Sequence, residues 1–464
     1  MVSTPAVVIA APASDSGKTT VATGLMGALR RAGRQVAPFK VGPDFIDPGY
    51  HALAALRPGR NLDPVLVGER LIGPLYRHGS AGADIAVVEG VMGLFDGRIG
   101  ENPTGTAEGS TAHVAALLGA PVILVVDARG QSHSIAALLH GFSTFDQSVR
   151  IAGVILNRVG SARHEEVLRQ ACEGAGVPVF GAIPRADELS VPSRHLGLVT
   201  VVEHGAQARA AVEAMTALVG RHLDLVGIAA VAASRVTDEP WDPAVAAPAA
   251  GNVTVALAAG KAFSFGYAEH GELLRAAGAD VVEFDPLTDP LPPQTAALVL
   301  PGGFPEQFST ELSTNDVVRQ QIRELAAGGA PVHAECAGLT YLVDELDGYP
   351  MCGVLSGSAR FTDRLTLGYR TAVAVAESPL HTIGDRIMGH EFHRTTAAFA
   401  DSYPPAWVFP RQREMSPVGR DLPAVRDGAI DRGVHAGYLH THPAAHPQAI
   451  TRFVAAAATS KLAG

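Results

Sequence analysis

Cysteine is scarce in this chain of 464 residues. Its three cysteines are Cys172, Cys336 and Cys352, and their spacing fits neither a disulfide framework nor a zinc site. Residues 1–5 also lack the basic region of a signal peptide. We therefore expect a cytoplasmic protein with reduced thiols.

Long apolar runs and an excess of positive charge are lacking as well. No 18 consecutive uncharged apolar residues occur, which argues against a transmembrane helix and predicts no membrane partner. The formal net charge is -10, with 36 Lys and Arg against 46 Asp and Glu. Because binding to a phosphate backbone depends on Lys and Arg, we expect no nucleic-acid partner. Small molecules are the expected partners, and the sequence leaves a homodimer open.

The chain does contain a long alternation of strand and helix patterns, typical of the α/β class. Its length exceeds one ordinary core, so more than one domain is expected. Short β-branched runs alternate with helical stretches such as 18–32 and 164–174, which indicates parallel sheets covered by helices. Strands are expected at residues 6–10, 36–39, 85–88, 122–126 and 151–156, and in a second series at 253–257, 281–284, 297–300, 332–334, 371–376 and 434–438. A stretch rich in Pro, Ala and Asp predicts a linker at 236–250 between domains of 1–235 and 251–464.

A candidate phosphate loop lies between the first expected strand and the first expected helix. Backbone N–H groups of such a loop, backed by a helix N-terminus, form an anion site. The residues predicted to bind ATP here are Ser16, Gly17, Lys18, Thr19 and Thr20. In this pattern the lysine reaches the outer phosphates and the following threonine contacts Mg²⁺. Pro12 stands where the pattern usually has its first glycine, and an ordinary turn containing Gly-Lys-Thr is the alternative.

Further polar residues follow the expected strands of the first half. Glu89 ends the strand at 85–88, at the sheet edge where ligands of α/β proteins bind, and is a candidate Mg²⁺ ligand. Asp127 has the same position after its own strand, and a solvated strand end is its equal alternative. The segment 40–48 combines Lys40 with two carboxylates, which suits phosphate, metal and substrate or else a charged surface turn. Asn157 is a candidate contact to a nucleotide base or a turn former.

The second half contains a candidate nucleophile. Cys336 follows an expected strand, precedes a helical run and has small residues two positions away on each side, as a sharp strand-to-helix elbow requires. The Ala337 N–H is one candidate oxyanion donor, and Gly303, after the strand at 297–300, is the other. A cysteine nucleophile needs a base. His440 is the candidate and His442 its competitor, while a buried structural cysteine is the alternative reading.

These two sites in one chain resemble the cobyrinic or hydrogenobyrinic acid a,c-diamide synthases of cobalamin biosynthesis. The segments 39–48, 88–97 and 389–393 carry the resemblance, which extends over nearly the whole chain. The first half is similar to dethiobiotin synthetase and the second to class I glutamine amidotransferases of the cobyric acid synthase type. The resemblance therefore implies a P-loop synthetase domain fused to a glutaminase domain.

The resemblance also implies an activity and a set of site residues. ATP and glutamine would drive amidation of the a and c acetate carboxylates of a corrin acid, with Mg²⁺. The implied roles are ATP and Mg²⁺ binding by Lys18 and Thr19, metal binding by Asp47 and Glu89, substrate contacts by Lys40, Asp44 and Asp96, an adenine contact by Asn157, and glutamine hydrolysis by Cys336 with His440 as base.

One position departs from the wider amidotransferase pattern. Ordinary class I enzymes carry a Glu two residues after the base, where this chain has His442, so the resemblance implies a Cys–His dyad and assigns no third group. A nickel-sirohydrochlorin a,c-diamide synthase and a ParA-like regulatory ATPase remain the alternative functions. Of these, the ATPase has no use for a cysteine elbow.

Overall fold

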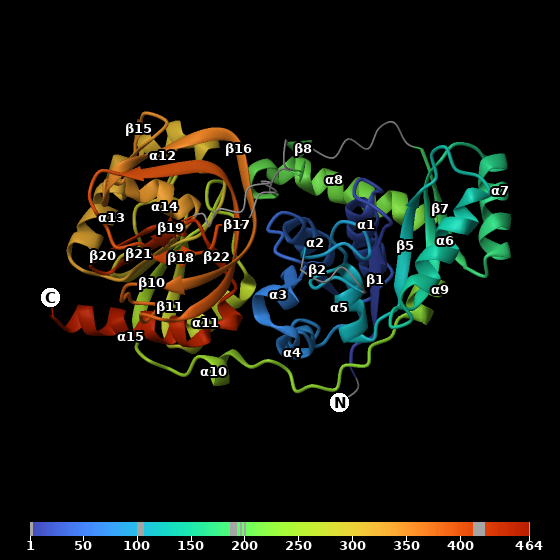
Figure 1. The fold of residues 1–464 in the computed structure, drawn as a ribbon, viewed down its shortest axis with the longest axis horizontal. Coiled ribbons are helices and arrows are strands. Elements are labelled where there is room, and N and C mark those ends of the chain that lie inside the picture. Colours follow the sequence, from blue (N-terminus) through green and yellow to red (C-terminus); the bar gives the residue numbers. More distant parts are fainter. Residues whose placement is uncertain are drawn as a thin grey trace. The chain divides into compact units, whose positions relative to one another are not determined.

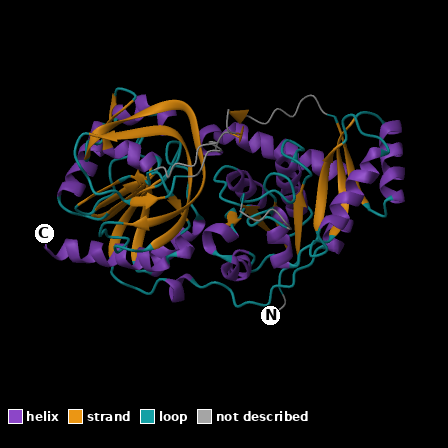
Figure 2. Ribbon diagram, in the orientation of Figure 1, coloured by secondary structure: helices purple, strands orange, loops and turns teal. Residues whose placement is uncertain are grey.

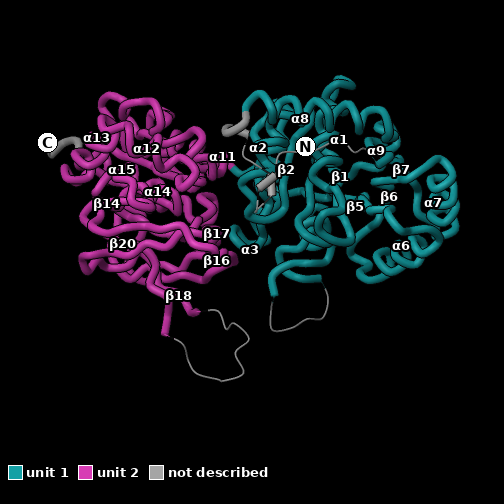
Figure 3. The backbone as a smooth tube through the Cα atoms, turned by 90° about the horizontal axis from the view of Figure 1, so that it is seen from above, with its two compact units in different colours: residues 1–241 teal, residues 242–464 magenta. Residues whose placement is uncertain are grey.

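The computed structural model describes residues 3–99, 106–185, 193–194, 197–198, 201–411 and 423–463. The chain forms two compact units, residues 1–241 and 242–464 (Figure 3). The segment expected as a linker contains a short helix, α10 (Pro243–Ala246). In the described part of the chain, no helix is both long and apolar enough to cross a membrane.

Unit 1 is built on a seven-stranded sheet with the order β3-β2-β4-β1-β5-β6-β7, in which all neighbouring strands are parallel. Every residue of β1 is buried, as expected for a strand covered on both faces. The strands are β1 (Ala6–Ala10), β2 (Val36–Val41), β3 (Arg60–Leu62), β4 (Ile85–Glu89), β5 (Val122–Asp127), β6 (Ile151–Val159) and β7 (Val179–Pro184). The carboxyl ends of β1, β2 and β4 therefore lie side by side.

Helices flank this sheet, as the purple and orange ribbons of Figure 2 show. Helix α8 packs against α1 and α2, and Figure 1 shows it lying along α1. The helices of unit 1 are α1 (Lys18–Arg31), α2 (Asp47–Ala55), α3 (Pro64–Val67), α4 (Glu69–Gly79), α5 (Thr111–Leu118), α6 (Ser134–Phe145), α7 (Ala162–Gly174), α8 (Val201–His222) and α9 (Leu225–Val231). A two-residue pair, β8 (Ser193–Arg194) and β9 (Gly197–Leu198), precedes α8.

Unit 2 contains two sheets. The first has the order β11-β10-β12-β13-β21-β20 and is parallel except for its edge strand β20. Its strands are β10 (Val253–Ala258), β11 (Ala279–Phe284), β12 (Thr295–Leu300), β13 (Val332–Glu335), β20 (Ala429–Asp431) and β21 (Val434–Gly437). The helices are α11 (Ala268–Ala276), η1 (Pro305–Gln307), α12 (Ser309–Thr314), α13 (Asp316–Ala327), α14 (Ala337–Leu342), η2 (Pro443–Ala445) and α15 (Pro447–Ala463).

The second sheet of unit 2 corrects one sequence-based expectation. The strand predicted at 371–376 is the end of a 20-residue strand that stops at Ala374 and belongs to a separate, mainly antiparallel sheet. Its strands are β14 (Val343–Leu346), β15 (Tyr349–Pro350), β16 (Leu355–Ala374), β17 (Arg386–Phe399), β18 (Trp407–Phe409), β19 (Val425–Asp427) and β22 (His440–Thr441). Much of β16 is partly exposed, so it lacks the continuous apolar run that marks the parallel strands.

A group of buried imidazoles lies within unit 2. The ring centroid of His381 is 4.8 Å from that of Trp407 and 5.4 Å from that of His435. Burial, together with the neighbouring imidazoles, lowers the pKa of His381 to about 3 and the pKa of His435 well below its usual value. Both side chains are therefore neutral at pH 7.

We expect unit 2 to lose stability as the pH falls below 6.5. The unfolded His381 takes up a proton near pH 6.5, whereas the folded side chain does so only near pH 3. Stability is thus complete above pH 6.5 and decreases toward pH 3, with a loss of about 2 kcal/mol at about pH 5 from this residue. The measurement is a pair of urea titrations, near neutrality and in mild acid, that follow Trp407 fluorescence with Trp241 replaced by Phe. His381→Gln should reduce the difference between the two titrations, and an unchanged difference would contradict the prediction.

Candidate functional site

The loop that follows β1 has the backbone of a phosphate-binding loop. Gly17 has φ +93°, and α1 begins at the next residue. The Asn157 side chain donates to the Ser16 carbonyl at 2.9 Å, and a Cβ at position 17 would lie 2.3 Å from Asn157 Nδ2. Only glycine therefore fits between the loop and the end of β6. Asn157, expected to contact adenine, contacts the backbone of the loop in this structure.

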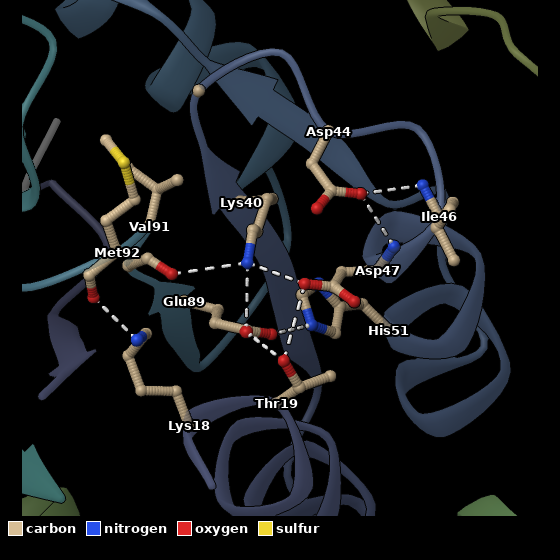
Figure 4. Close-up of polar contacts among 12 residues, drawn as sticks. Lys18, Thr19, Lys40, Asp44, Ile46, Asp47, His51, Glu89, Val91 and Met92 are labelled. Carbon is tan, nitrogen blue, oxygen red and sulfur yellow. Dashed lines mark hydrogen bonds and ion pairs between the residues drawn. The ribbon is translucent and has the colours of Figure 1, made fainter. Parts of the chain in front are cut away.

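Lys18 lies across the mouth of this loop. Its Nζ donates to the Met92 carbonyl at 2.6 Å and lies 3.4 Å from the Ala13 carbonyl. Burial, followed by the nearby Lys40 ammonium, lowers the pKa of Lys18. The segment after β4 is thereby held next to the phosphate loop (Figure 4).

A cluster of buried charges occupies the carboxyl ends of β2 and β4. Lys40 Nζ donates to Asp47 Oδ2 at 2.6 Å, to Glu89 Oε1 at 2.9 Å and to the Gly90 carbonyl at 3.2 Å. Thr19 Oγ1 lies 2.5 Å from Glu89 Oε1 and 3.4 Å from Asp47 Oδ2. Figure 4 shows these side chains converging from α1, β2, α2 and β4. The structure therefore brings together four predicted site residues from separate segments of the sequence.

The charges in this cluster balance one another. Burial alone would lower the pKa of Lys40, but Asp47 and Glu89 outweigh burial and raise it. Burial opposes ionisation of Glu89 too, yet Lys40 and His51 hold its pKa well below the usual range. Burial and the neighbouring carboxylates Asp44 and Glu89 raise the pKa of Asp47. Lys40 and Glu89 thus form the charged pair, and Asp47 is the carboxyl group most easily protonated.

His51 is a member of this cluster that sequence analysis missed. Its side chain is fully buried, and Nε2 lies 2.6 Å from Glu89 Oε2. It stands four residues after Asp47 on α2, and this spacing places both side chains on one helix face. This i, i+4 spacing from Asp47 is the sequence signal from which His51 could have been predicted as a site residue.

The two other predicted substrate residues hold backbone segments at the edge of the cluster. Asp44 Oδ1 accepts from the backbone N–H groups of Ile46 at 2.7 Å and Asp47 at 3.0 Å, at the start of α2. Asp96 Oδ2 accepts from the Gly93 N–H at 2.9 Å. Asp127, left open as a ligand, is instead paired with Arg129 and Arg158 at 2.7 and 2.6 Å.

The donor atoms of the cluster suit a hard divalent cation. A hydroxyl from Thr19 and carboxylates from Asp47 and Glu89 are the oxygen ligands that such cations prefer. Within the described ranges, no group of three or more His, Cys, Asp or Glu is arranged as a complete metal site. A cation at these oxygens would need its remaining ligands from a bound phosphate and water.

In unit 2, Cys336 occupies a strained elbow between β13 and α14. Its φ is +50° and its ψ is -96°, a conformation that costs about 1–3 kcal/mol for a residue with a side chain. A Cβ at Gly338 would lie 2.2 Å from the Leu300 carbonyl, so only glycine permits α14 to pack this closely against β12. Packing thus requires the glycine two residues after the cysteine.

The environment of Cys336 favours a neutral thiol. Burial and the Glu306 carboxylate raise its pKa, while the Ala337 backbone N–H acts in the opposite direction. A neutral thiol is a weak nucleophile and needs a neighbouring base. Ala337 is the first residue of α14, and N–H groups in a first helical turn have no partner within the helix. The turn after Cys336 therefore offers a donor to a developing negative charge.

The segment carrying His440 is held against the elbow. The Cys336 N–H donates to the Gly437 carbonyl at 2.7 Å, three residues before His440. His440 is fully buried, and a Cβ at Gly302 would lie 2.3 Å from its Cε1. The loop containing Gly302 and Gly303 therefore lies against the imidazole, and the candidate nucleophile, oxyanion loop and base occupy one region.

His442 has a different role from His440. Its Nδ1 accepts from the Ala444 N–H at 3.3 Å, and its ring lies 4.2 Å from that of Tyr267. It thus caps the turn that begins η2. His440 Nδ1, in contrast, lies 3.6 Å from the carboxylate of Glu335, a second residue that sequence analysis missed.

Comparison with known proteins identifies a domain in each half of the chain. Residues 7–199 match the CobQ/CobB/MinD/ParA nucleotide binding domain, and residues 254–448 match the CobB/CobQ-like glutamine amidotransferase domain. A hydrogenobyrinate a,c-diamide synthase from Mycobacterium tuberculosis (strain ATCC 25618 / H37Rv) is 71% identical over 98% of both chains. This chain belongs to the a,c-diamide synthase family. Another hydrogenobyrinate a,c-diamide synthase, from Streptomyces coelicolor, is 52% identical over 98% of both chains, and a cobyrinate a,c-diamide synthase from Synechococcus sp. is 38% identical over 97% of this chain and 98% of its own length.

Family membership confirms the predicted resemblance and the two-domain α/β fold. A nucleotide-binding domain and a glutamine amidotransferase domain in a synthase chain make the protein an ATP-dependent, glutamine-hydrolysing amide ligase. The family segment at 389–393 packs near the candidate base. Glu391 pairs with Arg370 at 2.5 Å, and the His393 ring stacks on Tyr438 at 3.9 Å. Position 390 is the strand partner of His440.

Asp427 is a further contributor that the sequence did not reveal. Its carboxylate accepts from the backbone N–H groups of Tyr438 and Leu439, at 3.0 and 3.2 Å, directly before His440. Burial raises its pKa to about 6. Asp427 therefore fixes the backbone that carries the candidate base.

Replacing Lys40 by Met should destabilise unit 1. Without the ammonium, the carboxyl groups of Asp47 and Glu89 remain buried without the charge of Lys40, and removing one partner of a buried ion pair costs about 3–5 kcal/mol. Urea titration followed by Trp241 fluorescence, with Trp407 replaced by Phe, measures the loss. Lys40→Met combined with Asp47→Asn is the matched control and should recover part of it. A single variant as stable as the parent chain would show that the ammonium does not stabilise the cluster.

Proposed function

We propose that this enzyme amidates the a and c acetate carboxylates of hydrogenobyrinic acid, using ATP and glutamine for each arm. The observation that carries the proposal is the presence of both a phosphate loop with a carboxylate cluster and a strained cysteine elbow in one chain of the a,c-diamide synthase family. The two sites provide the two half-reactions, activation of a carboxylate and release of ammonia.

Carboxylate activation takes place in unit 1. Thr19, Asp47 and Glu89 would hold Mg²⁺, which would offset phosphate charge when ATP is bound. Lys18 exchanges its carbonyl partners for the outer phosphates of the nucleotide. A substrate carboxylate oxygen attacks the γ-phosphorus, the bond to the β-phosphate oxygen breaks, and an acyl phosphate and ADP form. This step depends mainly on positioning and charge stabilisation.

Lys40 provides the supporting charge, and His51 adds a polar contact to Glu89. Because Lys40 contacts both Asp47 and Glu89, the carboxylates remain in place before the cation and nucleotide bind. His51 fixes the second oxygen of Glu89. Asp44 and Asp96 hold the loops around the cluster, at the sheet edge where we place the arm of the substrate that reacts.

Ammonia is released in unit 2. His440 accepts the proton of the Cys336 thiol, and the sulfur attacks the side-chain amide carbon of glutamine. The N–H groups of Ala337 and Gly303 stabilise the resulting oxyanion. His440 then gives its proton to the departing nitrogen, and water hydrolyses the thioester to glutamate. The ammonia displaces phosphate from the acyl phosphate, which completes one amide.

The relatives favour a metal-free corrin as substrate. Those that are 71% and 52% identical carry the name hydrogenobyrinate a,c-diamide synthase, whereas a relative named for cobyrinate is 38% identical. A regulatory ATPase of the ParA type would share the nucleotide-binding domain but would not need the second unit. We also place the enzyme in the cytoplasm, in keeping with its three free, buried cysteines.

Cys336→Ala should abolish synthesis from glutamine while retaining synthesis from high concentrations of ammonium salt, because unit 1 is unchanged. Amide formation is measured with each nitrogen source. Lys18→Ala is the mirror variant, and it should lose synthesis from both sources while retaining glutamine hydrolysis. Normal glutamine-dependent synthesis in Cys336→Ala, or loss of both activities in a folded protein, would exclude the assigned role.

Mass spectrometry of the products identifies the substrate. With hydrogenobyrinic acid, we expect a monoamide, then a diamide, and no further product. Asp44→Asn should reduce amidation strongly but spare glutamine hydrolysis, since asparagine keeps an oxygen for the N–H groups of Ile46 and Asp47 and removes only the charge. Turnover of sirohydrochlorin with no turnover of any corrinoid would move the enzyme to the nickel-tetrapyrrole alternative.

A further inference from the structure

Glu335 lies between the candidate nucleophile and the candidate base. It is the last residue of β13, directly before Cys336, and its side chain is only 14% exposed. Its Oε2 lies 3.6 Å from His440 Nδ1. One strand end therefore carries both the nucleophile and a carboxylate that faces the imidazole.

The Glu335 carboxylate is fixed by several donors. Oε1 accepts from the Thr441 N–H at 3.1 Å and from the Thr441 hydroxyl at 2.9 Å, and it lies 3.4 Å from His333 Nε2. These contacts leave Oε2 directed toward His440. A carboxylate held in this way has little freedom to turn away from the ring.

The usual position for an orienting carboxylate is filled by another group. Two residues after His440 the chain has His442, which caps η2 and packs against Tyr267. Two other carboxylates of this region have their own partners: Asp427 accepts from the backbone before His440, and Glu391 pairs with Arg370. Glu335, in contrast, lies with Oε2 3.6 Å from His440 Nδ1.

We propose that Glu335 is the positioning carboxylate of the glutaminase, completing a Cys336–His440–Glu335 triad whose acid precedes the nucleophile in sequence. The carboxylate beside Nδ1 favours the tautomer with its proton on that nitrogen, in which Nε2 carries the lone pair that accepts the thiol proton. It also stabilises the imidazolium that forms when the thiolate does. This inference rests on the proposed glutamine hydrolysis and assigns its missing third group.

The first test is the kinetics of Glu335→Gln. The variant keeps an oxygen for the Thr441 donors but has no charge, and its amide N–H favours the wrong tautomer of His440. We expect kcat for glutamine hydrolysis to fall about 10²-fold or more with little change in KM for glutamine. Synthesis from ammonium salt should remain normal, which shows that the chain is folded and unit 1 intact. Glu335→Asp retains the charge and should recover part of kcat.

The second test separates positioning from a simple charge effect. The rate of Cys336 alkylation by iodoacetamide is measured against pH in the parent chain and in Glu335→Gln. If Glu335 acted only as a nearby negative charge, its removal would make the thiolate easier to form, as expected for the matched control Glu306→Gln. If it stabilises the imidazolium of His440, the alkylation curve moves to higher pH instead.

The outcomes distinguish this inference from the proposed function. A parent chain without glutaminase activity would overturn the proposed function. An active parent chain, with Glu335→Gln within about threefold of its kcat and an alkylation curve that is unchanged or moved to lower pH, would overturn the triad alone.

Discussion

The buried contact of the Lys40 ammonium with the carboxylates of Asp47 and Glu89 joins the separate segments of the first site. Each residue comes from a different element, β2, α2 and β4, and Thr19 adds the start of α1. The ammonium stabilises the ionised form of both carboxyl groups inside the protein. Because an ion pair at such depth tolerates little misplacement, the elements that carry it must keep their register. The phosphate loop is connected to this arrangement by Lys18, which donates to the Met92 carbonyl in the segment after β4.

The second site depends on backbone strain to hold its nucleophile. Cys336 has a left-handed φ that the packing of Gly338 against Leu300 enforces, and its N–H is bonded to Gly437. These contacts are made by the same strands that form the core of unit 2. The strain is therefore stabilised by ordinary packing, and the thiol is held in a fixed position before any substrate is present.

Local patterns in the sequence predicted most of the parallel strands and the residues that end them. Glu89 and Cys336 could be predicted because a strand end or an elbow has a short-range signature. Only the last residues of the partly exposed β16, from Thr371, were predicted. The rest of this strand was missed because its apolar residues form no continuous run. His51 and Glu335 were missed for another reason. Their roles depend on partners 38 and 105 residues away, Glu89 and His440, and no local pattern encodes such contacts.

The two sites differ in the charge that they hold at rest, and this difference suits their chemistry. The first contains ionised Lys40 and Glu89 before any ligand binds, so a polyanionic nucleotide and a cation enter an environment that is already polar. The second holds a neutral thiol, and the nearby imidazoles of His381 and His435 are neutral as well. There, the thiolate appears only when a proton moves from sulfur to the base. A buried carboxylate beside that base lowers the free energy of this charge separation, because its attraction for the imidazolium is strong where water is excluded.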